Sequence, residues 1–460
     1  MSRIGWLVMP RAAGLLAAAG FVVGALLANN LQAQNGNCNF GGGNRVGGVT
    51  IDAQGALSSP DESMRKDIVA AMRTRHNEPR KELNLPVEMR RVSLRRLDEA
   101  LAAAKEGTAE KVADELRFLA GIQRIQYVLV YPDENDIVLA GPGEGWKVDE
   151  GTNIIGVTTG RPVIRLEDLL IALRSAEEAR QGGISCSIDP TPEGRRNLEA
   201  FLAKQRTFNP AVLVGVKEAL GPQEITLKGV PPTSHFARIL VSSDFHMKRI
   251  AMKLDPSPLK ELPSFIDMLK TENSKVTDLM PRWWMACNYL PVGRSADGLG
   301  FEIRGRGVKV LTEDEAVDGG AVRGTGKANP VAQKWADLMT EHYDELSLRE
   351  PAFGELRNIM DLCVVSALIA KEGLLEKAGC QLPTLMGANS PLGVIEYPAP
   401  KTVETQTSSL KRGREYIITA SGGVDINSWE VADKTEIRPE VAAVHAKAKP
   451  AKDLQTVWAN

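Results

Sequence analysis

The chain has 460 residues, of which 43% are hydrophobic and 25% charged, and this ordinary globular composition excludes wholesale disorder. Its 56 lysines and arginines stand against 58 aspartates and glutamates, so the formal net charge of -2 excludes long-range attraction of nucleic acid or anionic lipid. The length exceeds what one typical core needs, which predicts two domains or one large composite domain.

Residues 1–33 have the three parts of a secretory signal peptide. Arg3 and Arg11 give a basic start, residues 12–28 form an uncharged apolar stretch, and Ala33 is a small residue before Gln34. We therefore predict cleavage between Ala33 and Gln34 and export to the periplasm or the cell exterior. The alternative is an uncleaved N-terminal helix that anchors the protein, because the apolar stretch is somewhat long for a cleaved leader.

Beyond the leader, the sequence predicts neither a membrane span nor a cysteine scaffold. The longest apolar run extends from Leu362 to Ala370, well short of the roughly 20 residues that a spanning helix needs. The cysteines are odd in number and widely spaced, which fits neither a zinc knuckle nor a dense disulfide framework. They are Cys38, Cys186, Cys287, Cys363 and Cys380. Cys186 and Cys363 fall on apolar faces and are predicted to be buried thiols, whereas Cys38 is the thiol most open to pairing.

The first half of the mature chain alternates between helical and strand patterns. Residues 34–48 are rich in glycine and asparagine and are predicted to be flexible, and residues 49–260 are predicted to form a mixed α/β domain. The predicted helices are 64–75, 93–105, 166–180, 191–204 and 235–254, and the predicted strands are 125–131, 137–140 and 184–188. Ser234 is interpreted as the cap of the last helix and His235 as a surface residue after it.

Residues 275–435 are predicted to form a smaller antiparallel meander packed on long helices, which gives an α+β fold class. The predicted strands are 283–290, 299–304 and 308–312, the last two joined through Gly305-Arg306-Gly307. Pro351 begins a helix whose later turns are apolar nearly all round, which predicts a central, buried helix. A hairpin is predicted about a turn at 421–423, and the Ala-, Lys- and Pro-rich residues 436–460 are predicted to be a mobile tail.

Three neighbouring aromatic residues are the candidate binding residues in a chain with only 5% aromatic residues. On a strand, Trp283 and Tyr289 share one face and Trp284 lies on the other, so one of the tryptophans belongs to the core. The other tryptophan either lines a glycan- or peptide-binding surface or packs beneath a helix.

No metal ion or cofactor is predicted. The best metal cluster is His342 with Glu345, one helical turn apart, but His342 is in line with Leu338 and Leu346 and is interpreted as a core-edge histidine. Two glycine-rich stretches, 141–145 and 324–327, lack the following helix or the hydroxyl that a phosphate loop needs. No G-x-S-x-G occurs, and the histidines have no recognisable Asp or Cys partner nearby in sequence.

Several short phrases resemble a family of exported planctomycete proteins that is known only as a domain of unknown function. The phrases are 126–132 (QYVLVYP), 160–163 (GRPV), 183–192 (GISCSIDPTP), 281–284 (PRWW), 332–337 (AQKWAD), 421–424 (SGGV) and 427–429 (NSW). The resemblance covers roughly residues 45–435, so nearly the whole mature chain. It implies export and a shared architecture, and it implies no catalytic residue.

The predicted function is a structural or binding role in the cell envelope, with an envelope protein or polysaccharide as partner and no nucleic acid. The alternative is an exported hydrolase that acts on an envelope polymer, because acids and bases distant in sequence can converge in a fold. Since no matching catalytic set is found, the protein is predicted not to be an enzyme.

Overall fold

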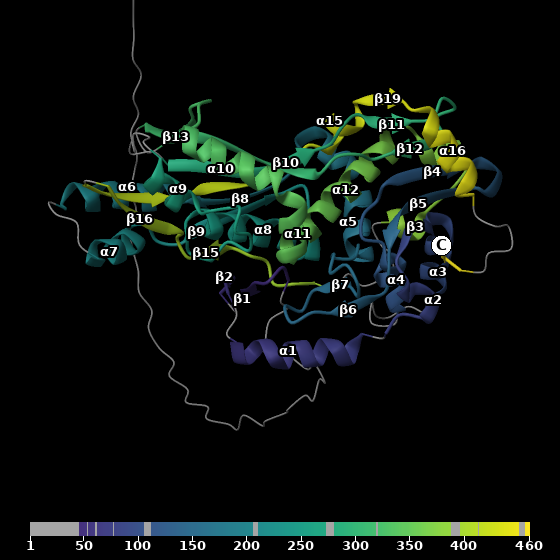
Figure 1. Ribbon diagram of the computed structural model, residues 1–460, viewed down its shortest axis with the longest axis horizontal. Helices are drawn as coiled ribbons and strands as arrows, with labels where there is room; N and C mark the ends of the chain where they lie inside the picture. The colour runs from purple at the N-terminus through teal and green to yellow at the C-terminus, as the bar shows by residue number, and fades with distance from the viewer. Residues whose placement is uncertain are drawn as a thin grey trace, which may run out of the picture. The chain divides into compact units, whose positions relative to one another are not determined.

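The computed structural model describes residues 46–460, apart from residues 53, 60–61, 77, 105–111, 206–209, 273–279, 319–320, 388–395, 413 and 450–455. The predicted leader, its cleavage site at Ala33 and Gln34, and Cys38 lie outside the described residues. Helices and mixed sheets occur along the described chain, so the predicted α+β class is confirmed (Figure 1). Among the described helices, none has the length and apolar character needed to cross a membrane.

Most helices begin where a cap residue or a proline predicts them to begin. Ser93 accepts a hydrogen bond from the amide of Arg96, and Ser234 accepts one from the amide of Ala237. The longer helices are α1 (Glu62–Arg75), α3 (Leu94–Ala103), α5 (Leu166–Gly182), α6 (Pro192–Ala203), α7 (Pro210–Leu220), α8 (His235–Ala251), α9 (Phe265–Thr271), α10 (Pro330–Glu341), α11 (Tyr343–Arg349), α12 (Pro351–Lys371) and α16 (Pro439–Lys447). The shorter ones are α2 (Lys81–Asn84), α4 (Asp114–Arg117), α13 (Leu374–Ala378), α14 (Pro383–Met386) and α15 (Ser428–Ala432).

Within the described residues, the larger sheet has nine strands in the order β1-β2-β15-β9-β8-β18-β10-β13-β14. These strands are β1 (Thr50–Ile51), β2 (Ala56–Ser58), β15 (Thr402–Val403), β9 (Gln223–Lys228), β8 (Ile184–Pro190), β18 (Ser421–Ile426), β10 (Met280–Asn288), β13 (Gly307–Asp318) and β14 (Ala321–Gly324). At its centre, β18 runs parallel to β10 and antiparallel to β8.

The other large sheet has seven described strands in the order β19-β11-β12-β4-β5-β3-β20. They are β19 (Thr435–Ile437), β11 (Val292–Arg294), β12 (Gly300–Glu302), β4 (Tyr127–Tyr131), β5 (Asp136–Gly143), β3 (Val87–Ser93) and β20 (Trp458–Ala459). Two strand pairs complete the described sheets, β16 (Thr407–Arg412) with β17 (Arg414–Thr419) and β6 (Trp146–Val148) with β7 (Ile154–Gly156). Both large sheets contain strands from residues 49–260 and from residues 275–435, and the division into those two domains stays a prediction.

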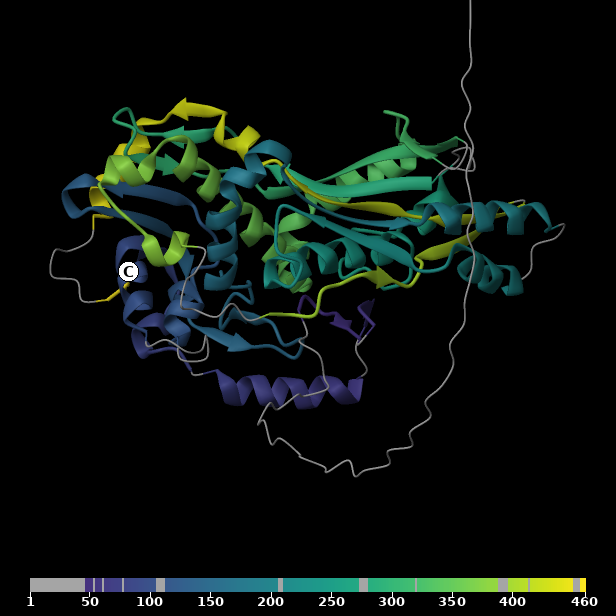
Figure 2. The same ribbon diagram turned by 180° about the vertical axis from the view of Figure 1, so that it is seen from behind.

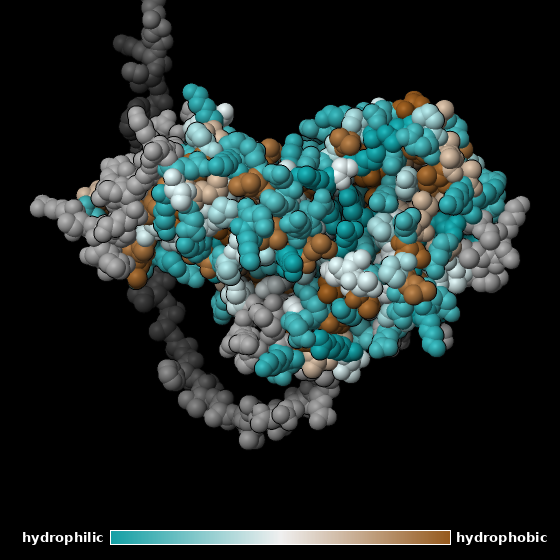
Figure 3. All heavy atoms as spheres, viewed as in Figure 1, coloured by the Kyte–Doolittle hydropathy of each residue, from teal (hydrophilic) through white to brown (hydrophobic). Residues whose placement is uncertain are grey.

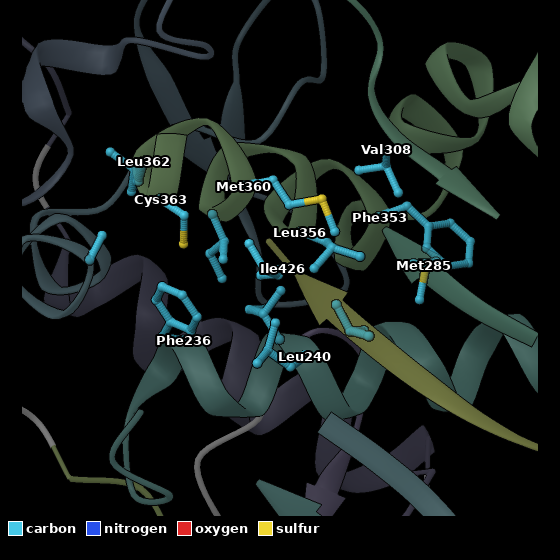
Figure 4. Packing of buried hydrophobic residues seen from close by; sticks show 14 of the residues in the cluster. Phe236, Leu240, Met285, Val308, Phe353, Leu356, Met360, Leu362, Cys363 and Ile426 are labelled. Carbon is cyan, nitrogen blue, oxygen red and sulfur yellow. The ribbon is translucent and has the colours of Figure 1, made fainter. Parts of the chain in front are cut away.

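Helix α12 is the central buried helix that its composition predicts. All its residues from Ala352 to Ile369 are buried, and the helix packs against α5, α8 and α15. Figure 4 shows Leu356 and Met360 of α12 on one side of Ile426 of β18, with Leu240 of α8 on the other side. On the side of the molecule seen in Figure 1, exposed hydrophobic residues are scattered among hydrophilic ones, which is normal for a folded surface (Figure 3).

The predicted hairpin about residues 421–423 is wrong. Ser421-Gly422-Gly423 begins the central strand β18, and residues 428–432 form helix α15. Gly422 has a φ of 137°, and a Cβ atom there would lie 1.6 Å from the carbonyl oxygen of Trp283. The two glycines therefore serve the close approach of neighbouring strands and not a turn.

The predicted meander is also different in its pairing. Strand β10 pairs with β13 as expected for an antiparallel pair, but β12 pairs with β4 in the other sheet. The linker Gly305-Arg306-Gly307 carries the chain from one sheet to the other, with positive φ angles of 115° at Gly305 and 88° at Gly307. Glycine tolerates such angles without the steric cost that other residues meet.

The prediction of a mobile tail at 436–460 is wrong for the described part of that segment. Helix α16 begins at Pro439, Val441 is fully buried, and the ring of His445 stacks on Tyr131 with centroids 4.5 Å apart. Strand β20 pairs with β3. Alanine- and lysine-rich composition is compatible with a docked helix when one apolar residue per turn reaches the core.

Candidate functional site

The nine-stranded sheet has a buried side and a side that we name the outer sheet face. Along the central strands, buried residues such as Trp283, Met285, Val424 and Cys186 alternate with residues that point the other way. The outer sheet face consists of Arg282, Trp284 and Ala286 of β10, Lys309, Leu311 and Glu313 of β13, Gly423 and Asp425 of β18, and Ser185 and Ser187 of β8. In Figure 1, α10 lies in front of β10 and β13, whereas Figure 2 shows the opposite side of these strands facing the viewer.

The predicted aromatic residues separate into one surface residue and two interior ones. Trp283 is fully buried and makes edge contacts with Phe265 and Trp335, at centroid distances of 5.0 and 5.1 Å. Trp284 is partly exposed on the outer sheet face, and the guanidinium of Arg282 lies 5.6 Å from the centroid of its indole. The period-two interpretation of this strand therefore predicts correctly that one tryptophan belongs to the core.

Tyr289 belongs to an internal network. Its hydroxyl donates to Asp361 Oδ1 at 2.7 Å, and burial raises the pKa of this hydroxyl. Arg124 donates to both oxygens of Asp361, from Nε at 2.9 Å and from Nη2 at 3.1 Å. The Tyr289 bond ties the residue that follows β10 to helix α12, and the fork-like pairing ties Arg124, which precedes β4, to the same carboxylate. Tyr289 is therefore not brought together with Trp284.

The weak metal candidates lie at a helix junction. Helix α10 ends at Glu341 and α11 begins at Tyr343, so His342 stands between them. His342 Nδ1 is 3.7 Å from Glu345 Oε2, and the Glu345 side chain is 63% exposed. Across the described part of the chain, no three His, Cys, Asp or Glu side chains gather as a metal-binding group.

The predicted burial of two thiols is confirmed. Cys186 and Cys363 are buried and unbonded, and burial raises the pKa of both thiols well above the ordinary value. Cys380 is buried as well, and Cys287 is partly buried. Thiols that stay protonated in apolar surroundings are poor nucleophiles and poor metal ligands.

Sequence reasoning missed a cluster that we name the buried charge centre, consisting of Asp168, His235 and Glu355. They come from the first or second turn of α5, α8 and α12. His235 Nδ1 lies 3.0 and 2.9 Å from the two oxygens of Asp168, and His235 Nε2 lies 4.0 Å from Glu355 Oε2. Their side chains are only 1%, 7% and 4% exposed for His235, Asp168 and Glu355.

The electrostatics of the buried charge centre favour neutral forms. Burial lowers the pKa of His235 to about 4 and raises that of Asp168 to about 7, and it also raises the pKa of Glu355. Arg165 lies beside the cluster, with Nη2 at 3.5 Å from Glu355 Oε1. His235 Nε2 and both Glu355 oxygens are buried and make no hydrogen bond within the described residues.

This arrangement can pass a proton between an imidazole and a carboxyl group, and it also joins three helices. A neutral imidazole beside a carboxyl group with a raised pKa is typical of acid–base pairs. The prediction that His235 lies at the surface is wrong, and it rests on the cap position alone. A second local signal is that the polar residues His235, Arg238 and Ser242 recur at helical spacing with apolar residues between them.

A second charged pair lies farther along the same helix. Lys248 Nζ donates to Asp244 Oδ2 and to the carbonyl oxygen of Ile188, each at 2.9 Å, and it reaches the carbonyl of Gly422 at 3.4 Å. Both side chains are completely buried. This lysine therefore connects α8 to strands β8 and β18 from inside the core.

A comparison with known protein families gives a match for one part of the chain. A family model described as a protein of unknown function (DUF1598) matches residues 186–265, which run from within β8 to the first residue of α9 and include all of α8. Among curated proteins and among solved structures, the search found no match. The matched segment thus contains His235, Asp244 and Lys248, and its description assigns no activity to them.

Proposed function

We propose that the protein is exported and has a binding role in the cell envelope, with the outer sheet face as its binding surface. The observation that carries this proposal is the partly exposed Trp284, which is flanked by Arg282 and has Leu311 and Gly423 as its cross-strand neighbours. Charged and hydroxyl side chains occupy the adjoining positions of the same face. Tryptophan and arginine are the side chains that contribute most to the affinity of binding surfaces. The leader at residues 1–33 and the resemblance to exported planctomycete proteins support export.

The alternative, an exported hydrolase acting on an envelope polymer, would use the buried charge centre. Its favourable feature is an imidazole between two carboxyl groups. However, the three side chains are at most 7% exposed, and an envelope polymer is too large to reach them. The partly exposed outer sheet face therefore supports binding better than the buried charge centre supports hydrolysis.

The binding role is tested by co-sedimentation with the envelope fraction of the cells that produce the protein. Protein isolated from those cells is sequenced from its N-terminus, and we expect it to begin at Gln34. Replacing Trp284 by alanine should reduce co-sedimentation about tenfold, in line with the loss of a central tryptophan from an interface. The control is Trp429→Ala, because Trp429 is also stacked by an arginine, with the Arg180 guanidinium 4.9 Å from its ring.

Equal co-sedimentation of the wild-type protein and Trp284→Ala would refute the outer sheet face as the binding surface. Turnover of peptidoglycan or polysaccharide that Asp168→Asn abolishes would establish the hydrolase instead. Recovery of a membrane-bound form that begins near Met1 would favour the uncleaved anchor.

A further inference from the structure

Next to Trp284, the outer sheet face has a small residue, Ala286, between two charged cross-strand neighbours, and we call this position the floor. Ala286 follows Trp284 by two residues on β10, so both point to the same face. Its cross-strand neighbours are Lys309 on β13 and Asp425 on β18. All three residues are partly exposed, and a methyl group is the whole side chain at the centre.

The indole of Trp284 lies next to this floor, two residues before Ala286 on the same face of β10, and we call it the aromatic wall. Arg282 precedes Trp284 on the same face of the strand, and its guanidinium lies over the ring at 5.6 Å. In the other direction along the strand comes Ala286, which is too small to cover the indole. On the neighbouring strands, Trp284 faces Gly423 of β18, which has no side chain, and Leu311 of β13, which is partly exposed. The indole is thus covered by Arg282 from one direction along the strand and by Leu311 on the side of β13, and it is bordered by small residues towards Ala286 and Gly423.

The two charged residues stand on opposite sides of the floor. Lys309 and Asp425 are separated by two strand spacings, about 10 Å between their backbones. Lysine supplies N–H donors, and the Asp425 carboxylate accepts, with Asn427 Nδ2 donating to its Oδ2 at 3.2 Å. One positive and one negative group balance each other, so the floor has no net charge to attract an ion.

We propose that this floor, which we name the Ala286 subsite, takes one sugar ring of an uncharged polysaccharide. A six-membered sugar ring has an apolar C–H face that packs against an aromatic wall, and its rim of hydroxyl groups both donates and accepts hydrogen bonds. Trp284 matches the apolar face, and Lys309 and Asp425 match hydroxyl groups on opposite edges. An anionic polymer would meet the Asp425 carboxylate, and an extended peptide would leave the aromatic wall without a flat partner. This assignment rests on the proposed binding role of the same face.

The test measures binding of the full mature protein to soluble, uncharged β-linked glucan and to soluble chitin oligosaccharides by calorimetry. We expect Trp284→Ala to weaken binding at least about tenfold. Ala286→Ile fills the floor and leaves Trp284 in place, and its β-branched side chain suits a strand, so we expect the same loss without a loss of folding. The matched control is Thr226→Val, an exposed, isosteric change on the same face in β9, which should leave the affinity unchanged.

The outcomes separate this inference from the proposed function. If neither saccharide binds while Trp284→Ala still reduces envelope co-sedimentation, the sugar assignment fails and the binding face stands. If Trp284→Ala changes neither measurement, both proposals fail. Sugar binding that Ala286→Ile leaves intact would move the sugar away from the Ala286 subsite, and preferential binding of an anionic glycan over the uncharged ones would overturn the ligand class.

Discussion

His235 and Asp168 touch each other but respond to burial in opposite directions. The folded protein lowers the pKa of His235 from 6.5 to about 4, so His235 contributes stability above pH 6.5 that is lost as the pH falls through 4. It raises the pKa of Asp168 from 3.8 to about 7, so Asp168 contributes stability below pH 3.8 that is lost as the pH rises through 7. Between pH 4 and 6.5 the two contributions to the free energy of unfolding therefore change with opposite sign.

Single substitutions separate these two contributions. Asp168→Asn removes the contribution of Asp168, which in the wild type decreases as the pH rises. The free energy of unfolding of this variant minus that of the wild type should therefore increase between pH 4 and 7. His235→Gln removes the contribution of His235, which in the wild type increases as the pH rises. The free energy of unfolding of this variant minus that of the wild type should therefore decrease between pH 4 and 6.5. Each change should amount to about 3–4 kcal/mol, because a pKa difference of one between the folded and unfolded states corresponds to about 1.4 kcal/mol. Urea unfolding at several pH values measures each change. Differences that do not depend on pH would show that the two groups keep their ordinary pKa values in the fold.

The residues of this strand and cluster show what local sequence can predict. Alternation along β10 correctly predicts that Trp283 and Trp284 lie on opposite faces and that one of them belongs to the core, because the two faces of a strand alternate with a fixed period. The structure shows that the core residue is Trp283. The cap at Ser234 is equally local. The prediction that His235 lies at the surface is wrong because its partners Asp168 and Glu355 lie on other helices. Local residue spacing does not predict that those helices pack together.

At the scale of elements, α8 carries charged side chains although all but two of its residues, His246 and Arg249, are buried. The pair Asp244 and Lys248 is completely buried, and its lysine bonds to the backbone of two strands. Removing one member of a buried ion pair leaves the other charge without compensation, and this is more costly than removing both.

Lys248→Met should therefore lower the free energy of unfolding by about 3–5 kcal/mol. The double variant Asp244→Leu with Lys248→Met should recover a large part of that loss, because the remaining buried charge is removed as well. Denaturant unfolding of the wild type, the single variant and the double variant provides the comparison. A double variant that is no more stable than Lys248→Met would show that the backbone contacts of Lys248 dominate.

Long helices were predictable, whereas the use of glycine was not. The apolar pattern in the later turns of α12 correctly predicts a central buried helix, because a helical segment without a polar face is stable only when other parts of the protein surround it. The sequence predicts a turn at Gly422 and Gly423, whereas in the structure they allow β18 to pass between β10 and β8. Composition cannot distinguish these two uses, since the close approach depends on strands far away in the sequence.

At the scale of the whole molecule, residues 435–459 supply both edge strands of the seven-stranded sheet. Strand β19 borders β11 at one edge and β20 borders β3 at the other. The C-terminal segment is held in place through α16 as well, where the Tyr131 hydroxyl donates to the carbonyl oxygen of His445 at 2.8 Å.

Deleting residues 435–460 should expose both sheet edges and make the remaining sheet prone to self-association. We expect aggregation on gel filtration and faster proteolysis of residues 87–143. Deleting only residues 456–460 exposes one edge and should have a smaller effect, which provides the control. Unchanged elution and protease resistance of the longer deletion would show that the edges are protected in another way.

The position of these edge strands in the chain also determines when the seven-stranded sheet can be completed during synthesis. A chain that emerges from a ribosome or a translocation channel in sequence order presents β3, β4 and β5 long before β19 and β20 exist. During that interval the sheet has two open edges, and such edges are where chains pair with one another by mistake. Completion of the sheet is therefore among the last folding events, and a helper protein that shields strand edges would act on the nascent chain within this interval.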